Sequence, residues 1–320
     1  MKIALFGAGR IGKVHAIAIS GSARATLASV TDPYAPNAEA LAAQFGVPVL
    51  SEEEVLSDES IDAVLIGSST DQHARQIMAA ASAGKAIFCE KPIDLDIDRV
   101  RHVLEHLKTH PVPFMLGFNR RFDPNFQALK AQIDAGAIGD IEMVTIMSRD
   151  PGLPPIDYVK VSGGLFRDMM IHDFDMARFL VGEEFSEVTA MGAVHVDPAV
   201  GEAGDVDTAV ATLKTASGKL VSISNSRRAT YGYDQRIEVH GSKGMLQADN
   251  VRESTVILSD ESGVRLEKPL HFFLERYAKA YDKEINAFVS LVVDGDKSAP
   301  GAEDGLKALE LAERALAASA

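Results

Sequence analysis

Apolar positions in the first third of the chain form short uninterrupted runs that alternate with longer stretches in which they recur every three or four residues. The short runs predict buried strands, and the longer stretches predict helices packed against them. We predict strands at 3–6, 25–31, 63–66, 86–89 and 114–117, and helices at 15–20, 37–45, 71–83 and 96–108. Strands that alternate with helices predict βαβ units, and therefore a parallel, doubly wound α/β sheet with helices on both faces.

The pattern changes after about residue 119. Apolar and polar residues alternate with a period of two at 206–215, 220–226, 235–240 and 244–248, which is typical of strands that are buried on one face only. We also predict a strand at 141–147 and helices at 124–135, 164–180, 273–293 and 303–318. The chain is therefore expected to have a first domain at 1–119 and a second domain at 120–320. The second is expected to be built on an open, mainly antiparallel sheet, and packing of its C-terminal helices back on the first domain is left open.

Composition narrows the classes of partner. The net charge of −14 disfavours nucleic acid and anionic membrane surfaces, because both are negatively charged. No apolar stretch reaches the length of a membrane span, and glycines interrupt the first apolar run too early for a signal peptide. The single cysteine, Cys89, excludes an intrachain disulfide and favours a reducing cytoplasm. We expect Cys89 to be a small buried side chain rather than a reactive thiol.

A glycine-rich turn follows the first predicted strand. Gly7, Gly9 and Gly12 have the G-x-G-x-x-G spacing that lets a strand turn tightly into a helix and lets a pyrophosphate approach the helix N-terminus. Asp32 ends the second predicted strand, at about the 20-residue distance where a carboxylate binds the adenosine ribose. This context predicts a Rossmann domain that binds NAD rather than NADP, although Arg10 is able to pair with a phosphate. The alternative is a glycine-rich turn without a ligand.

Three polar residues are candidates for proton transfer. Lys91 lies between the predicted strand 86–89 and Pro92, at the carboxyl edge of the sheet where open α/β folds bind ligands. Asp168 and His172 are four residues apart within the predicted helix 164–180, which places them on one face, one turn apart. A histidine titrates near neutral pH and is able to take a proton from an alcohol. The alternatives are a surface lysine and an amphipathic helix with a solvated acidic face; one histidine among aspartates has no zinc-type spacing, so we predict no metal site.

Several segments resemble one known family. The chain is similar to the Gfo/Idh/MocA oxidoreductases at Gly-Ala-Gly-Arg-Ile-Gly-Lys-Val-His (7–15), Glu-Lys-Pro (90–92) and Gly-Phe-Asn-Arg-Arg-Phe-Asp-Pro (117–124). The segments 163–180 and 224–236 resemble its inositol dehydrogenase branch. The resemblance covers essentially the whole chain. It implies a C-terminal α/β domain whose open sheet forms the interface of a homotetramer.

The resemblance also implies an activity: oxidation of myo-inositol at C2 to 2-keto-myo-inositol (scyllo-inosose), with NADH formed. Lys91, Asp168 and His172 are the implied catalytic residues, with His172 as the base, Asp168 holding its imidazole and Lys91 bound to the reacting oxygen. The expected cofactor contacts are Gly7, Gly9, Arg10, Ile11, Gly12, Asp32, Ser69, Thr70, His73 and Glu90. An uncharged polyol needs many hydrogen-bonding partners, and the expected ones are Arg121, Asp150, Tyr158 and Tyr233.

Two departures from the family pattern leave the substrate open. Ser148-Arg149-Asp150-Pro151 stands where many inositol dehydrogenases have His-Arg-Asn-Pro, and an aspartate in place of asparagine loses a donor. Many relatives also have Thr-Pro before the helix that here follows Gly67-Ser68-Ser69-Thr70. The alternatives are therefore another inositol, an aldose oxidised at C1, and a non-catalytic dinucleotide-binding sensor on the same fold. A periplasmic sugar oxidoreductase with tightly held NADP would need an export signal, which we do not expect here.

Overall fold

The computed structural model describes residues 1–319 of the chain. Contacts between residues divide it into two compact units. The first consists of Met1–Phe122 and Lys279–Leu309, and the second of Asp123–Ala278 and Glu310–Ala320. The predicted division at residue 119 into a cofactor domain and a substrate domain stays a prediction.

The first unit alternates strands and helices. Its elements are β1 (Lys2–Phe6), α1 (Arg10–Gly21), β2 (Thr26–Thr31), α2 (Ala35–Phe45), α3 (Glu52–Ser57), β3 (Ala63–Ile66), α4 (Thr70–Ser82), β4 (Ala86–Glu90), α5 (Ile97–Thr109), β5 (Phe114–Gly117) and a 3-10 turn, η1 (Asn119–Phe122). Helix α12 (Ala278–Val293) and the first part of α13 (Ala302–Ala318) complete it.

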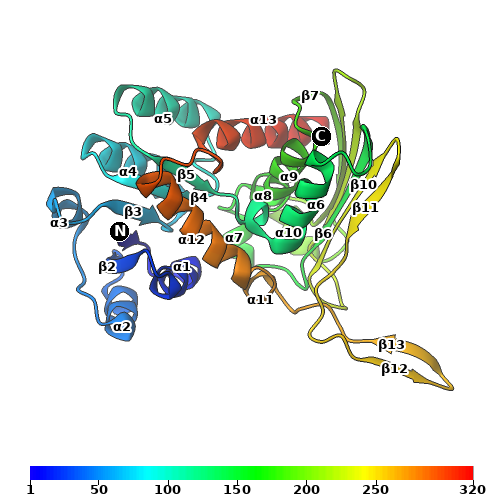
Figure 1. The fold of residues 1–320 in the computed structure, drawn as a ribbon, viewed down its shortest axis with the longest axis horizontal. Coiled ribbons are helices and arrows are strands. Elements are labelled where there is room, and N and C mark those ends of the chain that lie inside the picture. The colour runs from blue at the N-terminus through cyan, green and yellow to red at the C-terminus, as the bar shows by residue number, and fades with distance from the viewer. Residues whose placement is uncertain (320) are drawn as a thin grey trace. The chain divides into compact units, whose positions relative to one another are not determined.

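The five strands form one parallel sheet in the order β2-β1-β3-β4-β5. Every residue of β3 and β4 is buried, which explains why β3 and the first four residues of β4 are uninterrupted apolar runs in the sequence. In Figure 1, α1 lies beside α2 and α4 beside α5. The strand order reverses between β1 and β3, and such a switch point is where doubly wound sheets bind ligands at the carboxyl ends of their strands. The predicted Rossmann architecture is confirmed.

The second unit has one larger sheet with helices. Its elements are α6 (Pro124–Asp134), β6 (Ile141–Arg149), α7 (Ile156–Val159), α8 (Gly164–Asp168), α9 (Ile171–Val181), β7 (Phe185–Ala193), α10 (Pro198–Glu202), β8 (Thr208–Thr215), β9 (Leu220–Ser226), β10 (Asp234–Gly241), β11 (Gly244–Ala248), β12 (Ile257–Asp260), β13 (Gly263–Leu266) and α11 (Phe273–Arg276).

Six of these strands form a sheet in the order β11-β10-β6-β9-β8-β7. All neighbouring pairs are antiparallel except β6 and β9, which are parallel. Strands β8 and β9 alternate between buried and more exposed residues, so one face of the sheet is packed and the other is open. The open, mainly antiparallel sheet is therefore confirmed. Strands β12 and β13 form a separate ribbon that extends away from this sheet (Figure 1).

Two helices that the sequence predicts as continuous are interrupted. The predicted helix 164–180 is divided into α8 and α9, because the backbone N–H of Met170 bonds to the carbonyl of Leu165, five residues back. This bond widens the turn by one residue and ends the regular ladder. The predicted helix 273–293 is divided at Tyr277 into α11 and α12. The prediction that each of these helices is continuous was therefore wrong.

No helix among residues 1–319 is long and apolar enough to cross a membrane.

Candidate functional site

The turn after β1 requires glycine at two positions. Gly7 has a φ of +97°, and a Cβ there would lie 2.4 Å from the carbonyl oxygen of Gly67. A Cβ on Gly12 would lie 2.0 Å from the carbonyl oxygen of Gly7. Both distances are far inside van der Waals contact. The two glycines therefore let β1, β3 and α1 approach closely at the switch point of the sheet.

The middle glycine of the turn faces open space. Gly9 precedes α1, its φ is −73°, and a Cβ there would meet no atom within 4 Å. The N-terminal N–H groups of α1 have no partners within the helix, and they favour an anion. This open side of the turn fits the pyrophosphate of a dinucleotide. Arg10 is exposed and Ile11 half-buried at the start of the same helix.

Asp32 links the end of β2 to the glycine turn. Its Oδ2 accepts a hydrogen bond from the backbone N–H of Ala8 at 2.7 Å, and its Oδ1 accepts one from Tyr34 at 2.8 Å. The carboxylate is therefore fixed at the carboxyl edge of the sheet. A ribose hydroxyl is able to donate to it, whereas a 2′-phosphate would meet a like charge. The residues of this site fit NAD.

His73 connects two loops at the same edge of the sheet. The side chain is 2% exposed, with Nδ1 2.8 Å from the carbonyl oxygen of Pro92 and Nε2 3.1 Å from that of Ser68. Burial lowers the pKa of the imidazole. His73 therefore bridges the loop after β3 and the loop after β4. Two other residues expected at the cofactor lie at the start of α4: Ser69 precedes the helix, and Thr70 is its first residue.

Glu90 is the last residue of β4 and directly precedes Lys91. Its Oε1 is 2.6 Å from Nε2 of His15, which is fully buried. Its Oε2 accepts a hydrogen bond from the backbone N–H of Lys91 at 3.2 Å. The neighbouring Cys89 is fully buried, and burial raises the pKa of its thiol well above the ordinary value. Cys89 is thus an inert core residue, as expected.

In the second unit, Asp168 is fixed by two donors. Its Oδ1 accepts a hydrogen bond from the Tyr158 hydroxyl at 2.9 Å, and its Oδ2 accepts one from Nη2 of Arg227 at 3.1 Å. Arg227 is 2% exposed, and its Nη1 lies 3.7 Å from Oδ2 of Asp150. His172 follows Asp168 by four residues and is half-buried near the start of α9. The structure therefore brings Asp150 and Asp168 together through Arg227, and Tyr158 joins them by its own hydrogen bond to Asp168.

Two other predicted substrate residues have different surroundings. Nη2 of Arg121 donates to Oδ1 of Asp304 at 2.8 Å. Tyr233 is 6% exposed, and its ring contacts those of Phe272 and Tyr277 edge-on. These contacts do not connect Arg121 or Tyr233 to Asp168.

Arg227 is not among the predicted site residues, although it directly follows the predicted strand 220–226. Its position follows from the parallel pairing of β6 with β9, in which Arg149 is opposite Ser226. Asp150 and Arg227 are the next residues of the two strands, so they leave the sheet side by side. The signal in the sequence was a pair of polar residues after two strands, but the pairing itself was not visible there.

Ser148 lies in the segment that departs from the family pattern, and the structure shows a partner for its side chain. Its hydroxyl donates to Oδ1 of Asp173 at 2.5 Å, and the side-chain amide of Asn225 donates to Oδ2 at 2.8 Å. Asp173 is fully buried and directly follows His172. A buried carboxylate needs such donors, so Ser148 fixes the backbone beside His172 from the sheet.

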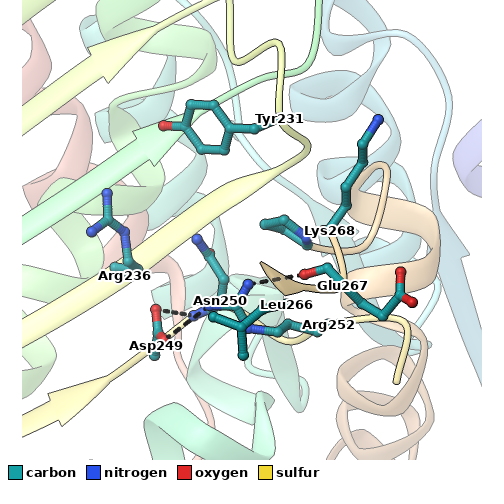
Figure 2. A pocket seen from close by; sticks show the side chains of 9 residues that line it. Tyr231, Arg236, Asp249, Asn250, Arg252, Leu266, Glu267 and Lys268 are labelled. Carbon is teal, nitrogen blue, oxygen red and sulfur yellow. Dashed lines mark hydrogen bonds and ion pairs between the residues drawn. The ribbon is translucent and has the colours of Figure 1, made fainter. Parts of the chain in front are cut away.

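A pocket of about 380 Å³ lies near the base of the β12–β13 ribbon (Figure 2). Arg252 crosses it, donating to the carbonyl oxygen of Glu267 at 3.0 Å and pairing with Asp249 at 3.6 Å. None of its lining residues is a predicted site residue. They are Tyr231, Arg236, Asp249, Asn250, Arg252, Leu266, Glu267, Lys268 and Pro269. Among residues 1–319, no three histidine, cysteine or acidic side chains are grouped so as to hold a metal ion.

A parallel sheet with a dinucleotide turn at its switch point and a separate sheet domain define a nicotinamide-dependent oxidoreductase. The family model described as "Oxidoreductase family, NAD-binding Rossmann fold" matches residues 1–118, and the "GFO/IDH/MocA C-terminal domain" matches residues 126–247. The chain belongs to the Gfo/Idh/MocA oxidoreductase family.

Three relatives show how far the similarity extends. The inositol 2-dehydrogenase of Rhizobium meliloti (strain 1021) is 54% identical over 99% of this chain and 96% of its own length. The myo-inositol 2-dehydrogenase of Thermotoga maritima is 48% identical over 97% of this chain and 94% of its own. The crystal structure of scyllo-inositol dehydrogenase from Lactobacillus casei, with bound NAD(H) and scyllo-inositol, has a TM-score of 0.92 at 33% identity, covering 100% of this chain and 96% of that one.

Proposed function

We propose that this protein is an NAD-dependent inositol 2-dehydrogenase that oxidises myo-inositol at C2 to 2-keto-myo-inositol (scyllo-inosose). The observation that carries the proposal is the fixed carboxylate of Asp168, held by Tyr158 and Arg227 in the segment that leads to His172. Support comes from the relatives named inositol dehydrogenases, which match nearly the whole chain.

The chain's residues move the hydroxyl proton. His172 accepts it from the C2 hydroxyl of the polyol, and the charge of Asp168 stabilises the imidazolium that forms. Tyr158 and Arg227 donate hydrogen bonds to Asp168 and orient its carboxylate. Lys91 donates a hydrogen bond to the reacting oxygen and stabilises its developing negative charge. NAD⁺, when bound, supplies the hydride acceptor.

The first experiment measures initial rates of NADH formation at mildly alkaline pH, with NAD⁺ or NADP⁺. The substrates are myo-inositol, scyllo-inositol, D-chiro-inositol and simple aldoses. The highest kcat/KM with myo-inositol and NAD⁺ is the expected result. A preference for scyllo-inositol or for an aldose would contradict the substrate but keep the chemistry, and no turnover with normal NADH binding would favour a sensor.

His172→Ala separates catalysis from cofactor binding. Loss of a general base lowers kcat by about 10²–10⁴-fold, and we expect the Kd for NADH to remain unchanged. The matched control is His102→Ala on α5, an exposed histidine that we expect to tolerate the change. Equal kcat values for the two variants would remove His172 from the mechanism.

We further propose a homotetramer in the cytoplasm, formed through the open face of the six-stranded sheet. Cross-strand register puts Met143 opposite Leu220 and Met191 opposite Val210, and each is at least 43% exposed. Exposed apolar patches of this kind mark interaction surfaces. Light scattering is expected to give four chains, and Met191→Lys to give a smaller assembly; a wild-type monomer at micromolar concentration would contradict the proposal.

A further inference from the structure

One segment of the second unit contacts the group around Asp168 by two routes. It follows β7, includes α10 and ends at Asp205 and Asp207, directly before β8. Asp207 is 0% exposed, and Asp205 is half-buried. Burial of a carboxylate is costly unless donors surround it. The donors around these two aspartates therefore show what each of them holds in place.

Three consecutive backbone N–H groups donate to the carboxylate of Asp207. That of His195 donates to Oδ1 at 2.8 Å, and those of Val196 and Asp197 donate to Oδ2 at 2.8 and 3.2 Å. The hydroxyl of Thr208 also donates to Oδ1, at 3.0 Å. Burial raises the pKa of Asp207, but these hydrogen bonds outweigh burial, so the pKa lies below the ordinary value of 3.8. Asp207 is therefore ionised at neutral pH.

The backbone of Asp207 connects this anchored turn to Arg227. Its N–H donates to the carbonyl of Ala193 at 3.2 Å, and its carbonyl accepts the N–H of Arg227 at 2.8 Å. Arg227 directly follows β9, and its Nη2 donates to Oδ2 of Asp168 at 3.1 Å. Asp207 thus holds the backbone of the arginine whose side chain holds Asp168.

Asp205 is connected to Asp168 through α8. Both of its oxygens accept from the backbone N–H of Leu165, at 3.0 and 3.1 Å. Gly164 leaves room for this carboxylate, since its φ is +81° and a Cβ there would lie 2.6 Å from Oδ1 of Asp205. Leu165 lies in the first turn of α8, and Asp168 is the last residue of this helix. Asp205 therefore fixes the short helix that carries Asp168.

We propose that Asp205 and Asp207 are positioning residues that hold Asp168 in place, Asp207 through Arg227 and Asp205 through α8. The proposal rests on the proposed function, in which Asp168 stabilises the imidazolium of His172. Both aspartates act through Asp168 rather than on the substrate. Misplacement of a catalytic group by about 1 Å costs up to about 10²-fold in rate. Loss of either aspartate should therefore lower kcat and leave the affinity for the cofactor unchanged.

Asp207→Asn tests the route through Arg227. The variant keeps the size of the side chain but replaces one acceptor with a donor that faces backbone N–H groups. We expect kcat to fall about 10–100-fold, with the Kd for NADH within about twofold of wild type. Glu202→Gln is the matched control, an exposed acid on α10 of the same segment, and its kcat should stay within about twofold of wild type. A wild-type kcat in Asp207→Asn would overturn this route.

A double variant shows whether Asp207 acts through Arg227. Arg227→Lys alone should lower kcat, because a lysine does not reproduce the geometry of the guanidinium. Adding Asp207→Asn to Arg227→Lys should lower kcat by less than about threefold more, since both changes remove the same connection. Losses in kcat that multiply independently would contradict the route through Arg227.

Asp205→Ala tests the route through α8. It removes the acceptor for the N–H of Leu165 and should lower kcat about tenfold. Asp205→Asn keeps one acceptor oxygen and should recover most of the lost activity. Equal kcat values for Asp205→Ala and wild type would remove Asp205 from the proposal.

Hydrogen exchange measures the same contacts without a substrate. The amide of Arg227 should exchange at least about tenfold faster in Asp207→Asn than in wild type. The amide of Leu165 should respond in the same way to Asp205→Ala. The reference is Ile146 in β6, a strand that lies between β9 and β10, and its exchange should not change. Unchanged exchange at Arg227 and Leu165, or equal acceleration at Ile146, would overturn the positioning role.

Failure of this proposal is distinguishable from failure of the proposed function. A wild type that is inactive on every polyol would refute the proposed function, whereas hydrogen exchange would still show whether the aspartates hold Arg227 and α8. If Asp207→Asn does not fold, Thr208→Val is the milder change, because it removes a single donor to Asp207. Exchange at Arg227 should still accelerate relative to Ile146 in this variant, and an unchanged ratio would count against the proposal.

Discussion

Gly9→Ala is expected to separate cofactor binding from folding. A Cβ at Gly9 meets no protein atom within 4 Å, and its φ of −73° is accessible to alanine. Loss of glycine at the N-cap costs only about 0.5–1 kcal/mol of stability. The added methyl group instead occupies the side of the turn that fits the pyrophosphate. Overpacking of about 1–3 kcal/mol corresponds to a Kd for NADH that is about 5–150-fold higher.

Two other glycines of α1 and its turn provide the comparison. In Gly12→Ala the Cβ would lie 2.0 Å from the backbone oxygen of Gly7, so the backbone must move, and we expect a loss of at least about 3 kcal/mol of stability. Gly21, at the end of α1, also has nothing within 4 Å of a Cβ and lies away from the turn. Gly21→Ala should leave the Kd for NADH unchanged.

The assay combines urea unfolding, followed by circular dichroism, with titration of NADH fluorescence. The chain contains no tryptophan, so protein emission does not interfere with the nucleotide signal. If folded Gly9→Ala binds NADH as tightly as wild type, Gly9 does not line the pyrophosphate site. A Gly12→Ala variant as stable as wild type would refute the close approach of β1 and α1.

Three further changes test the remaining assignments. Asp32→Ser should raise kcat/KM with NADP⁺ relative to NAD⁺ by roughly tenfold or more, since it removes a like charge from the 2′-phosphate; an unchanged ratio of initial rates would contradict this. Tyr158→Phe should lower kcat about tenfold at most, because it removes one hydrogen bond to Asp168 and Tyr158 is 46% exposed. A changed Kd for NADH would contradict the assignment of Tyr158 to the group around Asp168. Asp123→Ala should cost about 3–5 kcal/mol in urea unfolding, since it leaves the buried guanidinium of Arg276 unpaired; a loss below 1 kcal/mol would refute the importance of the pair.

The sheet of the first unit was largely predictable from the sequence. The predicted strands 63–66 and 114–117 coincide with β3 and β5, because buried parallel strands are short apolar runs that end at glycine or a turn. The position of Asp32 after β2 was predictable for the same reason. Here each local pattern agrees with the tertiary structure that it forms.

The strands that were not predicted from the sequence are those in which buried and exposed residues do not alternate regularly. All residues of β12 and β13 are exposed, so their apolar residues do not alternate with a buried face. Strand β7, which was also not predicted, has only two buried residues, Phe185 and Ala190. A period of two in apolar and polar residues indicates a strand with one buried face. It gives no signal where apolar side chains point away from the core.

The segment from Asp168 to His172 shows why the site was only partly predictable. Its four-residue spacing indicated one helical face, but the bond from Met170 to Leu165 widens the turn and puts the two residues on different helices. Met169 and Met170 keep right-handed helical angles, so neither glycine nor proline marks the break. Widened turns of this kind occur frequently at functional sites, because they alter the direction of a side chain without ending the segment. Packing therefore determines where His172 points, and this depends on contacts that are distant in the sequence, such as those of Asp173 with the sheet.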